Sequence, residues 1–297
     1  MKEYFKMKTL QDYINESLLD DFGEQSKDVK KLRIKEWLEK NNRYKSKFTI
    51  NDDYTIDTDS FWYDNYGEFP EYIQFNKCKG NFRIANRNKT SLKGCPRWVG
   101  GDFDCQDTGL TSLEGAPEYV KGRFSCSYNQ LASLEGCPEE VNGFDCIDNN
   151  LTSLVGAPKK VKNYFDCLGN QLTTLKGCPK EVGGKFNCSH NQLATLRYSP
   201  EKIRGNFDCS YNQLKTLEYG PKEVGGLYDC CDNQLVSLKG APDNIHNSFW
   251  CRRNQLTSLE DCPRYIDGAL DCRNNLLSEE QWDWAKKNID CKALYKK

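Results

Sequence analysis

Apolar and polar positions recur along most of the chain with a fixed spacing. A short Phe-Asp-Cys segment is followed by Asn-Gln-Leu-x-Ser-Leu, then a Gly-Cys-Pro or Gly-Ala-Pro corner, and then an x-x-Val segment. The cysteine of the first segment recurs in steps of 21 residues, with a single step of 20: Cys105, Cys126, Cys146, Cys167, Cys188, Cys209, Cys230, Cys251 and Cys272. Ile84 takes the same place one step earlier. A unit this short cannot bury its own apolar side, so the period predicts a solenoid of stacked coils.

Each position of the repeat has a physical role in such a coil. The phenylalanine two residues before each cysteine points to the same side of a short strand, because side chains alternate along a strand. Leucines such as Leu131 and Leu134 fill the interior. The proline favours an extended return segment, and the glycine before the Cys-Pro or Ala-Pro pair suits a corner with positive φ. An asparagine column from Asn129 to Asn275 predicts a buried amide ladder that satisfies backbone groups of the turns.

This pattern resembles the leucine-rich repeat, whose consensus is L-x-x-L-x-L-x-x-N-x-L-x-x-L. Here Phe and Cys take two of the leucine positions, and residues 84–277 carry the match. The short unit with its Pro-containing return resembles the short-repeat bacterial class, and strings such as NQLTSL and EGCP resemble leucine-rich-repeat proteins of bacteriophages and bacteria. The resemblance implies a curved solenoid with short parallel strands on the concave side and extended or turn segments on the convex side. No single activity is common to this class.

The N-terminal residues 1–57 do not follow the repeat. Residues 9–22 have apolar side chains at helical spacing, and Ser26 is expected to cap a second helix. The apolar side of that second helix is expected to consist of Val29, Leu32, Trp37 and Leu38. Alternating residues around Asn51-Asp52-Asp53 predict a hairpin. The segment is either a cap of the solenoid, whose end coil would otherwise expose an apolar cross-section, or a separate partner-binding module.

Two further segments complete the predicted organisation. Residues 58–83 are expected to form a degenerate first coil with an insertion. In residues 278–297, Ser278 begins a capping-box pattern that predicts a helix. That helix is expected to cover the last coil with Trp282, Ala285 and Ile289, and the tail after it is expected to be frayed.

Composition narrows the class of protein. The 297 residues include 42 Lys+Arg and 43 Asp+Glu, a net charge of -1, which excludes the overall electrostatic signature of a nucleic-acid coat or basic membrane binder. The mean hydropathy is -0.80, and no apolar run approaches the ~20 residues of a membrane helix. The polar N-terminus lacks the apolar core of a signal peptide. A cytoplasmic protein is therefore expected, in the host cytoplasm if the chain is phage-encoded.

The sixteen cysteines are expected to be reduced. Neighbouring strands lie ~4.8 Å apart, and disulfides between stacked cysteines would distort an in-register ladder. A second column alternates between alanine and cysteine, which indicates small buried positions rather than ligands: Cys95, Cys137, Cys178 and Cys262. A metal needs converging ligands, so neither a metal nor a cofactor is expected. Cys231 is the exception, because it follows a core cysteine and is expected to be an exposed thiol.

The residue between Phe and Cys is expected to point out of the strand, since its neighbours point inward. Aspartate fills six of nine of these positions: Asp104, Asp145, Asp166, Asp208, Asp229 and Asp271. Like charges on adjacent strands repel, and aspartate is unfavourable in strands. This acidic column either docks a basic surface or is simply the default of the repeat, inherited by duplication.

Departures from the repeat mark further candidates on the same concave surface. Aromatic side chains stand two residues after some core cysteines, at Tyr128, His190 and Tyr211, and a small patch near the C-terminal end combines Trp250, Arg252, Arg253 and Arg273. Aromatic residues and arginine are the usual anchors of protein interfaces; a solvated, variable surface is the alternative. Tyr198 and Tyr219 replace the corner glycine in consecutive coils, either as a convex contact site or as two repaired corners.

These features favour a non-enzymatic scaffold that binds a protein partner with a basic surface through a mainly acidic concave side. For a phage-encoded chain, the resemblance points to a host or host-defence factor as that partner. No catalytic residue is assigned, because no G-x-S-x-G, phosphate-binding loop or H-E-x-x-H string occurs and only His190 and His246 supply imidazoles. Nucleic-acid binding is less favoured because the acidic column lies beside the arginines. A structural or self-associating role stays open.

Overall fold

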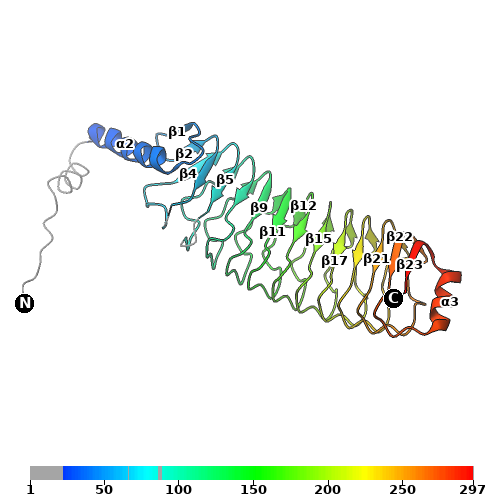
Figure 1. Ribbon diagram of the computed structural model, residues 1–297. Coiled ribbons are helices and arrows are strands. Elements are labelled where there is room, and N and C mark those ends of the chain that lie inside the picture. Colours follow the sequence, from blue (N-terminus) through cyan, green and yellow to red (C-terminus); the bar gives the residue numbers. More distant parts are fainter. Residues whose placement is uncertain (1–22, 66, 86–88, 297) are drawn as a thin grey trace, which may run out of the picture.

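The computed structural model describes residues 23–65, 67–85 and 89–296. Within these ranges the chain forms a curved solenoid of parallel-strand coils, from helix α2 (Gly23–Asn41) at one end to helix α3 (Glu279–Asn288) at the other (Figure 1). The predicted fold class, a curved repeat solenoid with small capping elements at both ends, is confirmed. The helix predicted over residues 9–22 lies outside the described residues.

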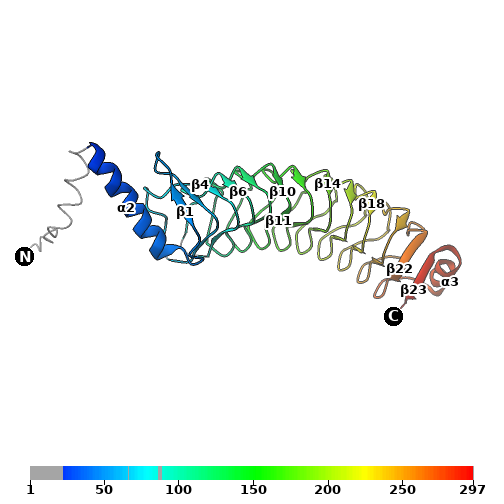
Figure 2. The ribbon, with the colours of Figure 1, turned by 90° about the horizontal axis from the view of Figure 1, so that it is seen from above.

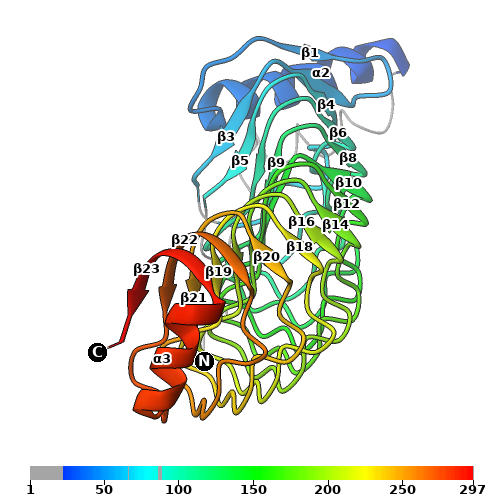
Figure 3. The ribbon, with the colours of Figure 1, turned by 90° about the vertical axis from the view of Figure 1, so that its right-hand side faces the viewer.

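The Phe-Asp-Cys segments form one long parallel sheet on the inner side of the curve (Figure 3). Neighbouring strands pair in register, so Phe144 lies opposite both Phe124 and Phe165. The strands are short because the chain turns after two or three residues: β3 (Phe61–Tyr63), β5 (Phe82–Ile84), β7 (Phe103–Asp104), β9 (Arg123–Ser125), β11 (Gly143–Asp145), β13 (Phe165–Asp166), β15 (Phe186–Asn187), β17 (Phe207–Asp208), β19 (Tyr228–Asp229) and β21 (Phe249–Trp250).

The x-x-Val segments form short parallel strands on the outer side of the curve (Figure 2). The predicted hairpin, β1 (Phe48–Ile50) and β2 (Ile56–Thr58), is antiparallel and extends this side at its N-terminal end. Its second strand pairs with the first outer strand. The outer strands are β4 (Phe75–Cys78), β6 (Trp98–Val99), β8 (Tyr119–Val120), β10 (Glu140–Val141), β12 (Lys160–Val161), β14 (Glu181–Val182), β16 (Lys202–Ile203), β18 (Glu223–Val224) and β20 (Asn244–Ile245).

Apolar columns fill the space between the two sides. In a central coil Phe165, Cys167, Leu172 and Leu175 are all 0% exposed, and Val161 closes the outer side at 4%. The same positions are buried in the neighbouring coils. The core is therefore one continuous column along the solenoid axis, and each coil buries its apolar side against the next, as the repeat period requires.

The core thiols contact the backbone of the following coil. The Cys167 Sγ lies 3.2 Å from the carbonyl oxygen of Asn187, to which it donates, and the Cys105 Sγ lies 3.3 Å from that of Ser125. All sixteen cysteines, which lie within the described ranges, are free. Burial raises the pKa of the Cys167 thiol well above its ordinary value. The prediction that the Phe-Asp-Cys cysteines form a buried column is confirmed.

The asparagine column ties each coil to the one before it. The Asn170 Nδ2 donates to the carbonyl oxygens of Cys146, in the preceding coil, at 2.9 Å and of Cys167 at 3.1 Å. Its Oδ1 accepts from the N–H of Leu151 at 3.1 Å. The arrangement recurs from Asn129 onward. The predicted amide ladder is therefore confirmed.

The corner glycines adopt positive φ, as predicted, with 98° at Gly177. A Cβ there would lie 2.2 Å from the carbonyl oxygen of Leu154 in the preceding coil, so the corner also needs the missing side chain. Tyr198 and Tyr219 keep the same left-handed conformation, with φ of 73° and 67°. Their side chains are 50% and 70% exposed. These two corners are strained rather than repaired, because a bulky L-residue is unfavourable at positive φ.

Helix α2 packs on the N-terminal end through its C-terminal half, where Ile34 and Leu38 are buried. It begins three residues before Ser26, so Ser26 lies inside the helix and the predicted cap is wrong. Val29 and Leu32, expected on the apolar side, are 42% and 54% exposed, because this part of the helix extends beyond the coil (Figure 2).

The C-terminal end is closed by a strand as well as a helix. Strand β22 (Tyr265–Asp271) pairs with β20 through Ile266 and with β21 through Leu270, which joins the two sides. The hydroxyl of Ser278 accepts from the N–H of Gln281 and caps α3, whose Trp282 is buried as predicted, together with Ala285 and Ile289. The tail expected to be frayed forms strand β23 (Asp290–Tyr295), because the open edge of β22 offers it backbone partners.

Candidate binding surface on the concave side

The aspartates between Phe and Cys act as turn residues. The Asp208 Oδ1 accepts from the N–H of Ser210 at 3.0 Å and from its hydroxyl at 2.7 Å. The same contact with the N–H two residues on occurs at Asp104, Asp166, Asn187, Asp229 and Asp271. The chain leaves the sheet at this point, and a side-chain oxygen satisfies a backbone donor of the turn. The acidic column therefore has a structural role in these turns. This role differs from both alternatives that the sequence suggested, which were docking of a basic surface and inheritance by duplication.

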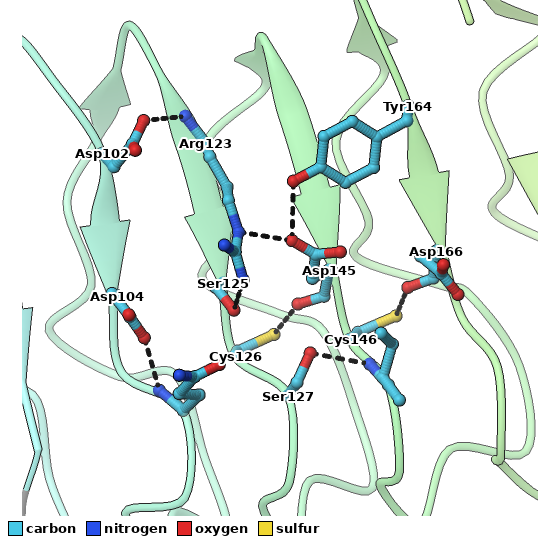
Figure 4. Close-up of polar contacts among 12 residues, drawn as sticks. Asp102, Asp104, Arg123, Ser125, Cys126, Ser127, Asp145, Cys146, Tyr164 and Asp166 are labelled. Carbon is cyan, nitrogen blue, oxygen red and sulfur yellow. Dashed lines mark hydrogen bonds and ion pairs between the residues drawn. The ribbon is translucent and has the colours of Figure 1, made fainter. Parts of the chain in front are cut away.

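Asp145 is the centre of a polar cluster on strands β9, β11 and β13 and the residue before β13 (Figure 4). It is only 6% exposed, its Oδ2 lies 2.5 Å from the Arg123 Nε, and the Tyr164 hydroxyl donates to the same oxygen at 2.9 Å. Burial raises the pKa of Asp145, although Arg123 and Tyr164 oppose the shift. Burial and the nearby Asp145 carboxylate raise the pKa of Tyr164. The Asp145 charge is thus held inside an ion pair rather than offered to solvent.

Arg123 and Tyr164 were not among the residues that the sequence singled out. The signal that could have found them is the single 20-residue step, which shortens the corner before Gly143. Gly143 lies opposite Arg123 in the sheet, and a Cβ on it would lie 2.7 Å from the Tyr164 ring. This glycine therefore leaves the space through which Arg123 and Tyr164 both reach Asp145.

Most of the other aspartates are paired as well. Asp104 lies 3.6 Å from Arg83, Asp166 lies 3.2 Å from Lys185, and Asp271 lies 2.7 Å from Arg273. Asp166 and Asp271 are also buried, at 9% and 4% exposure. Burial opposes ionisation of Asp271, but hydrogen bonds from Arg273 hold its pKa below the usual value. The expectation of a continuous, exposed acidic column is therefore corrected, because cationic side chains one coil away or two residues away neutralise it.

Two aspartates in the C-terminal half of the acidic column have no ion pair with a described residue. Within the described ranges, no lysine, arginine or histidine lies within ion-pair distance of Asp208 or Asp229. Both are half-buried and stand opposite each other on neighbouring strands. Burial, together with the Asp208 charge, raises the pKa of Asp229. The concave acidic surface is therefore much shorter than the sequence predicted.

The residues two places after each core cysteine form a column at the rim of the concave sheet, which we call the rim column. All have positive φ, including Tyr128 (58°), His190 (53°) and Tyr211 (52°). Tyr128 and Tyr211 are 53% and 43% exposed, and the rings of His190 and Tyr211 stack 4.2 Å apart at 11°. Gly169 and Asn274 occupy equivalent positions with the same backbone. The turn therefore does not need the aromatic side chains that these positions display.

The predicted arginine patch is partly neutralised. Trp250 is half-buried on β21. Arg253 and Arg273 are each paired with an aspartate, at 3.4 Å and 2.7 Å. Arg252 is half-buried, and its Nε has no hydrogen-bond partner among the described residues. The structure thus brings these residues onto neighbouring coils but leaves Arg252 as the arginine of the patch without an ion pair.

Cys231 is buried at 1% exposure, so the prediction of an exposed thiol is wrong. Its N–H donates to the Asp229 Oδ1 at 2.9 Å. Burial and the Asp229 carboxylate raise the pKa of its thiol. In the part of the chain that the structure describes, no three His, Cys, Asp or Glu side chains are placed to hold a metal ion. No helix in the described ranges is long and apolar enough to cross a membrane.

No protein-family model and no curated protein matches the chain. Among solved structures, the chain is similar to YopM from Yersinia enterocolitica WA-314, with 18% sequence identity and a TM-score of 0.42. The match covers 79% of this chain and 57% of that one, so the chain spans a little over half the length of the structure it matches.

Proposed function

We propose that the protein is a non-enzymatic scaffold that binds a protein partner through the rim column and the adjoining concave strands. The observation that carries the proposal is the exposure of Tyr128, His190 and Tyr211 at positive φ. An L-residue in this conformation costs about 1 kcal/mol or more, and the repeat fills the same turn with Gly, Asp, Asn or Arg elsewhere. Because aromatic residues are frequent anchors of interfaces, a contact that uses the rings accounts for the cost.

The partner that fits this surface carries cationic side chains. Among the described residues neither Asp208 nor Asp229 forms an ion pair, and the exposed side chain of Asp148 in the rim column makes no hydrogen bond or ion pair. Complementary charges speed encounter and exclude wrong partners. The sixteen free thiols fit a reducing compartment such as the cytoplasm.

A triple variant tests the proposal: Tyr128→Asn, His190→Asn and Tyr211→Asn. Asparagine tolerates positive φ and already holds this turn at Asn274, so the variant is expected to fold. Wild-type protein should capture a partner from a lysate of the source organism, and the variant should not. The control is Tyr119→Asn, an outer-side tyrosine that is 43% exposed. Equal capture by the triple variant would exclude the rim column, and sedimentation of the wild type alone separates self-association from partner binding.

A further inference from the structure

The outer side of the solenoid carries an open hollow over strands β12, β14 and β16, with a volume of about 800 Å³ (Figure 3). Two carboxylates and six cationic side chains line it, and the cations are Lys159, Lys160, Lys162, Lys180, Lys202 and Arg204. One carboxylate, Glu140, is paired with Lys160 and Lys162. Among the residues that the structure describes, Lys180 and Arg204 form no ion pair. The hollow is therefore a cationic surface that the chain neutralises only in part.

A glycine keeps the middle of the hollow free of side chains. The position after each outer apolar residue reads Lys162, Gly183 and Arg204 in three consecutive coils. Gly183 packs so closely on the preceding coil that a Cβ would overlap the carbonyl oxygen of Lys162. Since no side chain fits there, Gly183 lies exposed between two cationic side chains.

The spacing of these two cations suits a carboxylate. Lys162 and Arg204 are two coils apart, about 9.6 Å at ordinary strand spacing. A carboxylate that accepts one charge-assisted hydrogen bond on each oxygen spans about 8 Å between its two donors. Both side chains are long and exposed, so their ends can close the difference. An ammonium has three donors, so Lys162 can hold Glu140 and a second carboxylate together.

The glutamates of this side favour an acidic side chain over a nucleic acid. Glu181, the second carboxylate of the hollow, lies opposite Lys202 on the neighbouring strand, and Glu223 follows at the same position two coils further on. A nucleic-acid backbone carries a negative charge at every nucleotide, so it would pass both glutamates along this side. A peptide can place one carboxylate over Gly183 and uncharged residues beside the glutamates.

We propose that the hollow over Gly183 binds an aspartate or glutamate side chain of a second protein, with Lys162 and Arg204 as its charge partners. The inference goes beyond the proposed function, because it assigns the outer side of the solenoid and a charge preference opposite to that of the concave side. The two sites share no residue, so either can fail in an experiment while the other stands.

The test is fluorescence anisotropy of fluorescein-labelled hexaglutamate, titrated with the whole chain at neutral pH and low salt. We expect saturable binding that weakens roughly four- to twenty-five-fold in Lys162→Gln/Arg204→Gln, since each exposed ion pair contributes about two- to fivefold. The control, Lys121→Gln/Lys215→Gln, removes the same charge from two exposed lysines outside the hollow and should bind like the wild type. Absence of saturable binding, or equal losses in the two double variants, would overturn the proposal, as would tighter binding of labelled hexauridylate.

A second pair of variants tests the site with the opposite sign. Glu181→Gln removes a carboxylate from the wall of the hollow, so hexaglutamate should bind roughly two- to fivefold more tightly. Glu135→Gln removes an exposed carboxylate that does not line the hollow, and it should leave binding unchanged. Equal gains in both variants, or no gain in Glu181→Gln, would exclude the hollow as the site.

Discussion

The side-chain amide of Asn191 donates to the carbonyl oxygen of Cys167, in the preceding coil, over 3.1 Å. It also donates to Cys188 at 3.2 Å and accepts from the N–H of Leu172 at 2.9 Å. Asn191→Leu should therefore destabilise the protein by about 3 kcal/mol or more, because each buried backbone group left unpaired costs about 1–3 kcal/mol. Urea unfolding followed by circular dichroism measures the change. Gln192→Leu, the same substitution at the exposed neighbour, should have little effect, and equal midpoints for the two variants would contradict the role of the ladder.

Reversal of the charge at Asp145 should disrupt folding rather than only binding. The carboxylate is buried beside Arg123, and a lysine in its place would bury two cations together. Breaking a buried pair costs about 3–5 kcal/mol, so Asp145→Lys should lower the free energy of unfolding by at least that amount. Asp208→Lys, which removes a turn contact but no ion pair, should cost less. Equal unfolding free energies for both variants would contradict the buried cluster.

Tyr219→Gly should stabilise the protein. Tyr219 has φ of 67° and is 70% exposed, so glycine relieves the backbone and removes few contacts. The left-handed conformation costs an L-residue about 1–2 kcal/mol, and the greater freedom of glycine in the unfolded chain offsets about half of that. The expected result is a higher thermal midpoint. Tyr119→Gly, on a strand of the outer side, should lower it; a loss of stability in Tyr219→Gly would show that the ring makes contacts that outweigh the strain.

Thiol labelling should distinguish the half-buried Cys291 from the fully buried cysteines. Cys291 lies half-buried on β23 and should react with iodoacetamide first. Cys231 should react as slowly as its neighbour Cys230, since both are buried and burial raises the pKa of both thiols. Mass spectrometry of peptides after timed labelling gives the rates. If Cys231 were labelled at the rate of Cys291, its thiol would be exposed, as the sequence suggested.

Alkaline pH should weaken the solenoid. Burial raises the folded-state pKa of thiols such as Cys167, Cys188 and Cys209, so these groups stay protonated while unfolded thiols ionise near pH 8.5. Their contribution to stability is fully present below about pH 8.5 and is lost as the pH rises above it, by more than about 1 kcal/mol per thiol and pH unit. Urea midpoints measured between pH 7 and 9.5 with reductant present should fall steeply. A flat profile would mean that the thiols ionise in the folded chain.

The repeat made the fold readable from sequence. Nine cysteine-centred units in register define which side chains point inward, and the buried Phe, Cys, Leu and Val positions agree with that pattern. The two ends of the solenoid were less predictable, because the contacts of the capping elements occur once and are not part of the repeat. Nothing in the sequence of the tail indicates that β22 leaves an open edge for residues 290–295.

For the concave surface, the sequence predicted which residues lie on it but not which of them are exposed. Alternation places Asp145 outside the core, but whether it is exposed depends on side chains from neighbouring coils. Arg123 and Tyr164 reach it because Gly143 leaves room. Contacts between coils, about 21 residues apart in sequence, are set by absent side chains as much as by present ones.

The register of the sheet has an evolutionary consequence. Each inner strand bonds only to the strands of the coils before and after it, as Phe165 does to Phe144 and Phe186. A duplication or deletion of one whole repeat in the coding sequence would therefore rejoin equivalent positions and preserve every kind of contact. The reach of the concave surface can change by about 4.8 Å at a time, and a lineage can match the size of a new partner by adding or losing coils.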